Sequence, residues 1–173
     1  YRAMSLPSPY TGPATEQTYI GRIVAKGGDV VQLIDGRAQV NGISIDSQIP
    51  LKFLYLLNEN QAQANQTILQ QLGPSELLEQ TVQGAILAFL EDGQYEAFPN
   101  SDRPARFDPP IESLLDGTPA ATWVQPDWTF NNYGPITVPA NHFFILGDNR
   151  SNSEDSRHRG PIPNAAVIAT LFD

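Results

Sequence analysis

A loop rich in hydroxyl, amide and charged side chains follows an apolar run near the end of the chain. The apolar run covers residues 142–146, and residues 147–157 have the sequence Gly-Asp-Asn-Arg-Ser-Asn-Ser-Glu-Asp-Ser-Arg. Gly, Asn and Asp favour turns, whereas the apolar run has the length of a strand. A strand that leads into such a loop commonly carries a binding or catalytic site, so this loop is the first candidate.

The loop holds the residue types of a catalytic triad, but their spacing does not suit one. Ser153 or Ser156 would be the nucleophile, His158 the base and Asp155 the orienting acid. A triad needs hydrogen bonds in series, and three residues so close together in one loop rarely converge in that way. We therefore predict no Ser-His-Asp triad.

The carboxylates of the loop raise the question of a metal site, because clustered carboxylates bind hard cations. The three acidic residues are Asp148, Glu154 and Asp155, but Arg150 and Arg157 neutralise them, and the spacing is not that of a binding loop. The sequence therefore predicts neither a metal site nor a bound cofactor.

The first part of the chain has the pattern of a β-meander. Residues 19–25, 30–34 and 39–45 are strand-like, with turns at Gly27-Gly28-Asp29 and Asp35-Gly36 and an Asn-Gly turn within the third run. Further strands are expected at 128–130, 136–138, 143–146 and 166–172, the first two within a stretch rich in proline.

The middle of the chain predicts a helical hairpin. It is rich in Gln from residue 61 to 71, and a Gly-Pro-Ser break at 73–75 then precedes an apolar series with helical spacing. The members of the series are Leu77, Leu78, Val82, Ile86, Phe89 and Leu90. This apolar stripe must be buried, either on the β core or against another protein.

Charge and composition exclude several classes of partner. The chain has nineteen acidic and ten basic residues, and its net charge of -9 disfavours binding to nucleic acid. The chain has no Cys, so it forms no disulfide and no thiolate metal site. The absence of Cys fits both an oxidising and a reducing compartment. No apolar run approaches the roughly 20 residues that span a bilayer, and the first residues lack the pattern of a targeting peptide.

Two segments of the sequence resemble the type I signal peptidase family, which consists of membrane-anchored serine endopeptidases. The loop Gly-Asp-Asn-Arg-Ser-Asn-Ser-Glu-Asp-Ser-Arg-His-Arg-Gly (147–160) is similar to the C-terminal motif of that family. Residues 21–29, with the turns that follow them, are similar to the family's strand with a Lys-Arg pair and its Gly-Asp turn. Together the resemblance covers residues 19–45 and 128–172. One departure lies at Arg159, where the family usually has an aromatic residue, so we expect weaker packing of the loop.

The resemblance implies a Ser-Lys dyad, in which a desolvated lysine takes a proton from the nucleophilic serine. The lysine position is occupied here by Gly21, and the chain has only Lys26 and Lys52. Lys26 would lie about 16 Å further along an extended strand and on its opposite face. Lys52 falls in a segment that the resemblance does not cover. The lysine base is therefore predicted to be lost.

The nearest counterpart of the family's serine is Ser5, in Met4-Ser5-Leu6-Pro7, although the spacing from the lysine strand is shorter than in the family. The alternative is that this stretch is an extended or disordered N-terminal segment. The resemblance further implies that Ser153 helps to orient the lysine and that charged residues hold the loop by ion pairs, with Arg22 or Arg157 expected against Asp155. These scaffold residues are Arg22, Asp29, Asp148, Arg150, Asp155 and Arg157.

The expected fold is mainly β: a signal-peptidase-type β-sheet or partly closed barrel domain with a helical hairpin insertion. We expect an extended N-terminal segment (1–18), a β core (19–50 and 126–173) and an inserted helical and proline-rich subdomain (51–125).

Two functions remain open from the sequence. The chain is either a signal peptidase that cleaves exported preproteins after small side chains, or a non-catalytic relative that binds protein subunits of a membrane assembly. Both place it at the extracytoplasmic or lumenal face of a membrane, attached through a segment absent from this chain.

Overall fold

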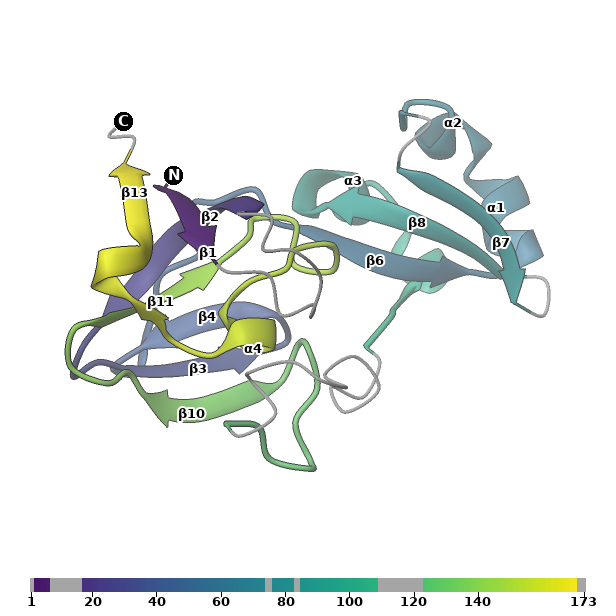
Figure 1. Cartoon of the computed structure of the whole chain (residues 1–173). Helices are drawn as coiled ribbons and strands as arrows, with labels where there is room; N and C mark the ends of the chain where they lie inside the picture. Colours follow the sequence, from purple (N-terminus) through teal and green to yellow (C-terminus); the bar gives the residue numbers. More distant parts are fainter. Residues whose placement is uncertain (1, 7–16, 74–75, 83–84, 109–122, 171–173) are drawn as a thin grey trace. The chain divides into compact units, whose positions relative to one another are not determined.

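The computed structural model describes residues 2–6, 17–73, 76–82, 85–108 and 123–170 (Figure 1). The described strands form three sheets, and the chain divides into two compact units. The core unit comprises Tyr1–Ile49 and Asp108–Asp173, and the inserted unit comprises Pro50–Phe107. The mainly β architecture expected from the sequence is confirmed, and no closed barrel is formed by the described strands.

The first sheet of the core unit has five strands in the order β12-β11-β2-β1-β13, and its paired strands are antiparallel. The long strand β2 lies between β1 and β11, so it can present residues to both. The bounds are β1 (Arg2–Leu6), β2 (Gln17–Lys26), β11 (His142–Leu146), β12 (Ile162–Pro163) and β13 (Val167–Thr170). The helix α4 (Ser156–Arg159) follows β11, and a 3-10 turn (Asn164–Ala166) precedes β13.

The second sheet of the core unit has the order β10-β3-β4-β5. Its bounds are β3 (Val30–Ile34), β4 (Arg37–Val40), β5 (Ile43–Ser44) and β10 (Tyr133–Thr137). The turns Asp35-Gly36 and Asn41-Gly42 have positive φ at all four residues, which is the geometry that joins adjacent antiparallel strands tightly. The predicted meander is therefore confirmed.

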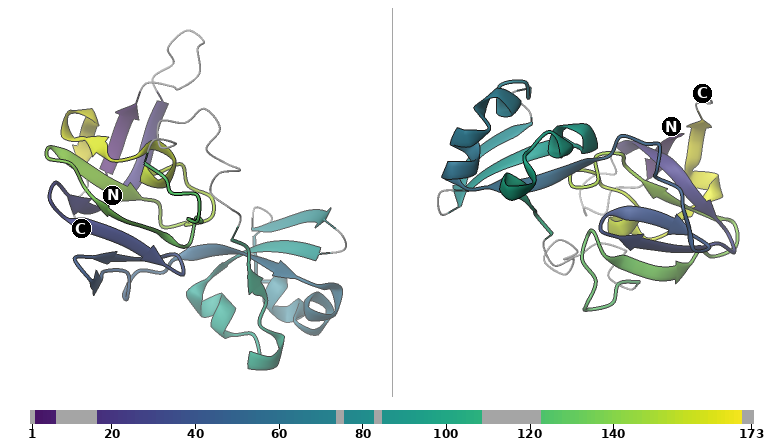
Figure 2. Two further views of the ribbon diagram at one scale, coloured as in Figure 1. Left: turned by 90° about the horizontal axis from the view of Figure 1, so that it is seen from below. Right: turned by 180° about the vertical axis from the view of Figure 1, so that it is seen from behind.

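The two sheets of the core unit lie against each other (Figure 2), and they share one apolar core. Alternate residues of β3 and of β11 point into it, as expected for a strand with one face on the core. Its fully or nearly fully buried members are Ala25, Val31, Leu33, Ala38, Phe130, Tyr133, Ile136, Val138, Phe144 and Leu146. A smaller cluster around Ile145 and Ile162 lies apart from this core and includes Tyr19 and Ile23 of β2.

The inserted unit has a four-stranded sheet in the order β7-β8-β6-β9. The predicted helix over residues 77–90 is wrong, because this segment forms two paired strands; the Gln-rich part does form two short helices. The full length of β8 except Ala85 pairs with β6, a pairing that was not predicted. The bounds are β6 (Lys52–Leu57), α1 (Glu59–Ala64), α2 (Gln66–Leu69), β7 (Leu77–Val82), β8 (Ala85–Glu91), α3 (Asp92–Glu96), a 3-10 turn (Asn100–Asp102) and β9 (Ala105–Arg106).

Other expectations are met in part. Residues 128–130 form no strand beyond an isolated bridge, whereas the strand expected at 166–172 appears as β13, with 171–172 outside the described residues. The expected extended N-terminal segment contains β1, and residues 7–16 lie outside the described part. Within the described ranges, none of the helices has the length and apolar character needed to cross a bilayer.

Candidate functional site

The charged loop is attached to β11 through a break in the strand pairing. The register between β11 and β2 shifts between Phe144 and Ile145, and the backbone N–H of Ile145 donates a hydrogen bond of 2.9 Å to Ser156 Oγ. Asp155 caps α4, because its side chain accepts from the backbone N–H of Arg157. The buried Ser156 and this cap hold the end of the loop against the strand.

Asp155 and Arg157 form a buried ion pair. Arg157 Nε and Nη2 donate to the two carboxylate oxygens at 2.9 and 2.7 Å, and the backbone N–H of Gly147 donates at 3.1 Å. Burial by itself would raise the pKa of Asp155, but the Arg157 guanidinium and the hydrogen bonds hold that pKa well below its usual range. Asp155 is thus a permanent carboxylate that organises the loop.

Arg150 makes a second buried pair, with Asp46. Its Nη1 and Nη2 donate to the carboxylate at 2.8 and 3.0 Å, while Nε donates to the Gly147 carbonyl at 3.0 Å. Nη1 also donates to the Gly36 carbonyl at 2.8 Å. Asp46 accepts from the backbone of Ala38, so the pair clamps the loop to the second sheet. Asp46 was not predicted as a site residue, because it lies 104 residues from Arg150 and has no local motif.

Arg22 pairs with Asp148 at the start of the loop. Nε and Nη2 donate to the carboxylate oxygens at 3.0 and 2.9 Å, a bidentate geometry that fixes both planes. The side chains are 27% and 17% exposed, so water screens this pair more than the two buried ones. Of the two arginines expected as partners of Asp155, Arg157 forms that pair, whereas Arg22 pairs with Asp148.

Ser153 folds back over Gly147. Its hydroxyl donates to the Asn149 carbonyl, and a Cβ built on Gly147 would lie only 1.9 Å from Ser153 Oγ. The loop therefore needs glycine at 147 to hold Ser153 in this place. The resemblance assigns Ser153 to the orientation of a lysine, and the structure directs its hydroxyl to the backbone of its own loop.

Gly21 is buried in β2 and has no side chain to offer as a base. A Cβ built on it would lie 2.6 Å from Cγ2 of Ile145 and 3.4 Å from the Leu146 carbonyl. The same strand carries Arg22, so the arginine of the expected Lys-Arg pair is present, whereas the lysine is replaced by glycine.

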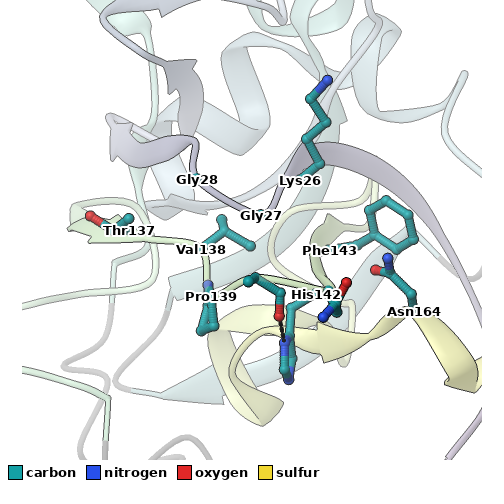
Figure 3. Close-up of a pocket in the computed structure, with 11 residues that line it drawn as sticks. Lys26, Gly27, Gly28, Thr137, Val138, Pro139, His142, Phe143 and Asn164 are labelled. Atoms are coloured by element: carbon teal, nitrogen blue, oxygen red, sulfur yellow. Dashed lines mark hydrogen bonds between the residues drawn. The ribbon is translucent and has the colours of Figure 1, made fainter.

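Neither lysine of the chain takes the place of the missing base. Lys26 ends β2, beside a pocket of about 640 Å³ that lies at the other end of β11 from the charged loop. Figure 3 shows the Lys26 side chain extending away from Pro139 and His142, which line this pocket. Lys52 lies in the inserted unit, where a hydrogen bond from its amine to Glu76 raises the pKa of that amine. A raised pKa opposes the role of a proton acceptor.

Ser5 lies in β1 and is aligned with Thr18 of β2, whereas Gly21 is aligned with Arg2. Thr18 is three positions along β2 from Gly21. The register therefore does not bring Ser5 beside position 21.

Asp29 lies at the opposite end of β2 from the charged loop. Its carboxylate accepts from the backbone N–H of Lys26 at 3.0 Å and from the Asn41 side chain at 2.9 Å, and these bonds lower its pKa. The residue holds the turn between β2 and β3. It therefore belongs to a different part of the scaffold from Arg22 and Asp148.

Arg159, the departure from the family pattern, is packed against Tyr19. Its guanidinium carbon lies 4.3 Å from the centre of the Tyr19 ring, and it donates to the Tyr19 hydroxyl and to Glu154. The Arg159 side chain is only 7% exposed. A stacked guanidinium thus covers β2 at this point, which argues against the weaker packing expected from the sequence. Among the described residues, no group of acidic or histidine side chains has the arrangement of a metal site.

The sequence is similar to known proteins of one family. The sequence pattern of the family described as "Signal peptidase, peptidase S26" matches residues 5–172. The probable signal peptidase I-2 of Synechocystis sp. (strain ATCC 27184 / PCC 6803 / Kazusa) is 42% identical over 40 residues, covering 23% of this chain and 18% of the relative. Signal peptidase I of Leptolyngbya laminosa is 41% identical over 58 residues, with 32% and 27% covered. Signal peptidase I V of Bacillus subtilis (strain 168) is 34% identical over 65 residues, with 37% and 39% covered.

The matches thus span less than two fifths of the length of each of these relatives. A solved structure of a signal peptidase I from Enterococcus faecalis V583 aligns with 99% of this chain and 93% of its own, at 20% identity and a TM-score of 0.39. Because the family pattern covers nearly the whole sequence, the chain belongs to the signal peptidase family, peptidase S26.

Proposed function

We propose that this chain is a signal-peptidase-type domain that binds the signal peptides of exported preproteins without cleaving them by the Ser-Lys mechanism. The observation that carries the proposal is Gly21, which stands where the family resemblance requires the general base. The Ser-Lys mechanism needs a neutral amine within hydrogen-bond reach of the serine. A glycine supplies none.

The scaffold around this position supports a retained binding role. Ion pairs hold the loop, among them Arg22 with Asp148, Arg150 with Asp46, and Arg157 with Asp155. These pairs hold the loop in place although position 21 carries no lysine, so the scaffold does not require the general base. By its family, we place the domain at the extracytoplasmic or lumenal face of a membrane, where preproteins emerge.

Measuring both the binding and the cleavage of one peptide distinguishes a binding domain from an active peptidase. A precursor peptide with an Ala-X-Ala site is incubated with the chain and with Ser5→Ala, cleavage is followed by mass spectrometry, and binding is followed by fluorescence anisotropy. We expect both proteins to bind the peptide and neither to cut it. A peptide with Asp in place of both Ala residues is the control, and it should bind more weakly because the family accepts small side chains.

Turnover by the unmodified chain that disappears in Ser5→Ala would contradict the proposal and show a working peptidase with another base. Absence of both binding and cleavage would also contradict it, and would favour a purely structural subunit.

A further inference from the structure

Position 21 lies in the middle of a strand, where glycine is an unfavourable choice. Glycine packs no side chain and loses more backbone entropy than other residues, so within a strand it often marks a close approach of another group. Gly21 is buried, and its strand lies between β1 and β11. The atoms nearest to a Cβ at this position show which group approaches it.

That group is the side chain of Ile145. Ile145 is aligned with Ile23 of β2, so it shares a face with Gly21, two residues away. The distance of 2.6 Å from its Cγ2 to a Cβ at position 21 is shorter than real Cβ contacts allow. Within the two strands, Ile145 fills the volume that a side chain at position 21 would occupy.

Ile145 has little freedom to move aside. It is β-branched, so its χ1 angle is restricted, and its side chain is fully buried against Ile162. Its backbone N–H is bonded to Ser156 Oγ, which fixes the strand at the register shift. A residue with a Cβ at position 21 must therefore displace the packing around Ile145.

We propose that Ile145 closes position 21 to any side chain, so that a lysine is accommodated there only when Ile145 is also reduced in size. The steric part of this inference is independent of function, whereas its meaning for catalysis rests on the proposed function. The chain therefore differs from a form with a lysine base at two positions, Gly21 and Ile145. Gly21→Lys alone does not rebuild the site.

A double-mutant cycle in the unmodified chain tests the contact. The urea midpoint of unfolding is measured for Gly21→Ala, Ile145→Ala and the double variant. We expect each single change to lower the midpoint, the first through overlap and the second through a cavity. In the Ile145→Ala background, Gly21→Ala should leave the midpoint unchanged or raise it, because its methyl group enters the vacated space.

Gly93→Ala is the matched control, because a Cβ at Gly93 meets no atom within 4 Å and the residue lies in α3, where alanine is favoured. It should not lower the midpoint in either background. Equal losses from Gly21→Ala in both backgrounds would overturn the inference.

Lysine at position 21 extends the same test to the larger side chain. Gly21→Lys should lower the urea midpoint much more in the presence of Ile145 than with Ile145→Ala. Equal midpoint losses in both backgrounds would overturn the inference. The steric inference and the proposed function can fail separately. Peptide cleavage by the unmodified chain would refute the proposed function without changing the result of the double-mutant cycle. Additive midpoint changes in the cycle would refute only the steric block of position 21 by Ile145.

Discussion

At the scale of single residues, the charges of the loop are engaged in structure. Asp155 and Asp46 each hold an arginine in a buried bidentate pair, and Arg150 and Arg157 also donate to backbone carbonyls. Removing one partner of such a pair leaves a buried charge without compensation, which costs more than the pair contributes. The carboxylates therefore fix the loop in place and are poor candidates for proton transfer.

The Asp155 pair predicts a specific dependence of stability on pH. Its pKa is depressed in the folded state, so its contribution is complete above the unfolded value of about 3.9 and is lost as the pH falls further towards the folded pKa. We expect Asp155→Asn to lower the free energy of unfolding at pH 7 by about 3–5 kcal/mol, because Arg157 is left unpaired. Denaturant titrations between pH 7 and pH 2 measure this, and the gap between the two proteins should narrow below pH 4.

Asp148→Asn serves as the comparison, because its pair with Arg22 is partly exposed. It should cost no more than about 1 kcal/mol. A loss for Asp155→Asn as small as that for Asp148→Asn, or a gap that does not change with pH, would speak against a structural role of the buried pair.

At the scale of elements, tight turns decide how the strands of the core unit follow one another. Asn41 and Gly42 both have positive φ, and the Asn41 side chain accepts from the Val30 backbone at 2.9 Å and donates to Asp29. One amide thus joins the turn after β4 to the turn before β3. The hydrogen bond to Asp29 needs an amide, since a carboxylate at position 41 has no proton to donate.

We expect Asn41→Asp to lower the melting temperature at pH 7, because the change places two carboxylates side by side and removes the donor to Asp29. The left-handed backbone itself tolerates Asp, so the effect is electrostatic. The deficit should shrink when acid protonates either group, and calorimetry at pH 7 and pH 4 measures it.

Asn60→Asp is the control, since Asn60 is exposed in the first turn of α1, where a negative charge is favourable. It carries the same charge change and should not lower the melting temperature. A deficit for Asn41→Asp that is the same at both pH values would exclude the carboxylate repulsion.

At the scale of the whole molecule, the chain combines a core unit that carries the family loop with a separate inserted unit. The inserted unit has its own ion-pair network, in which Lys52 lies between Glu76 and Glu91. It also has its own aromatic stack, formed by Tyr55 and Tyr95 at a ring separation of 4.7 Å. These interactions stabilise the inserted unit from within.

The net charge of -9 predicts that the chain by itself does not bind polyanions. We expect no co-sedimentation with vesicles of phosphatidylglycerol and no shift of duplex DNA at low salt, where electrostatic attraction would be strongest. Vesicles of phosphatidylcholine are the control for apolar binding. Salt-sensitive binding to either polyanion would contradict the prediction and point to a local basic surface.

Local physical chemistry explains what was predictable from the sequence. The turns at Asp35-Gly36 and Asn41-Gly42 need residues that accept positive φ, so the meander was visible from the residue types alone. The family motif in residues 147–160 likewise predicted the position of the loop after β11, and the family match supports that resemblance. The absence of a lysine at position 21 is also a property of the sequence.

The tertiary structure decided what depends on a distant partner. The apolar residues of 77–90 fit the spacing of a helix. The segment instead forms two strands, because β7 pairs with β8 and β8 pairs with β6, and such pairing depends on the neighbours that the fold supplies. Asp46 meets Arg150 across 104 residues, and Ile145 meets Gly21 across two strands. Such contacts leave no local pattern, since burial and bond geometry exist only once the strands have been assembled.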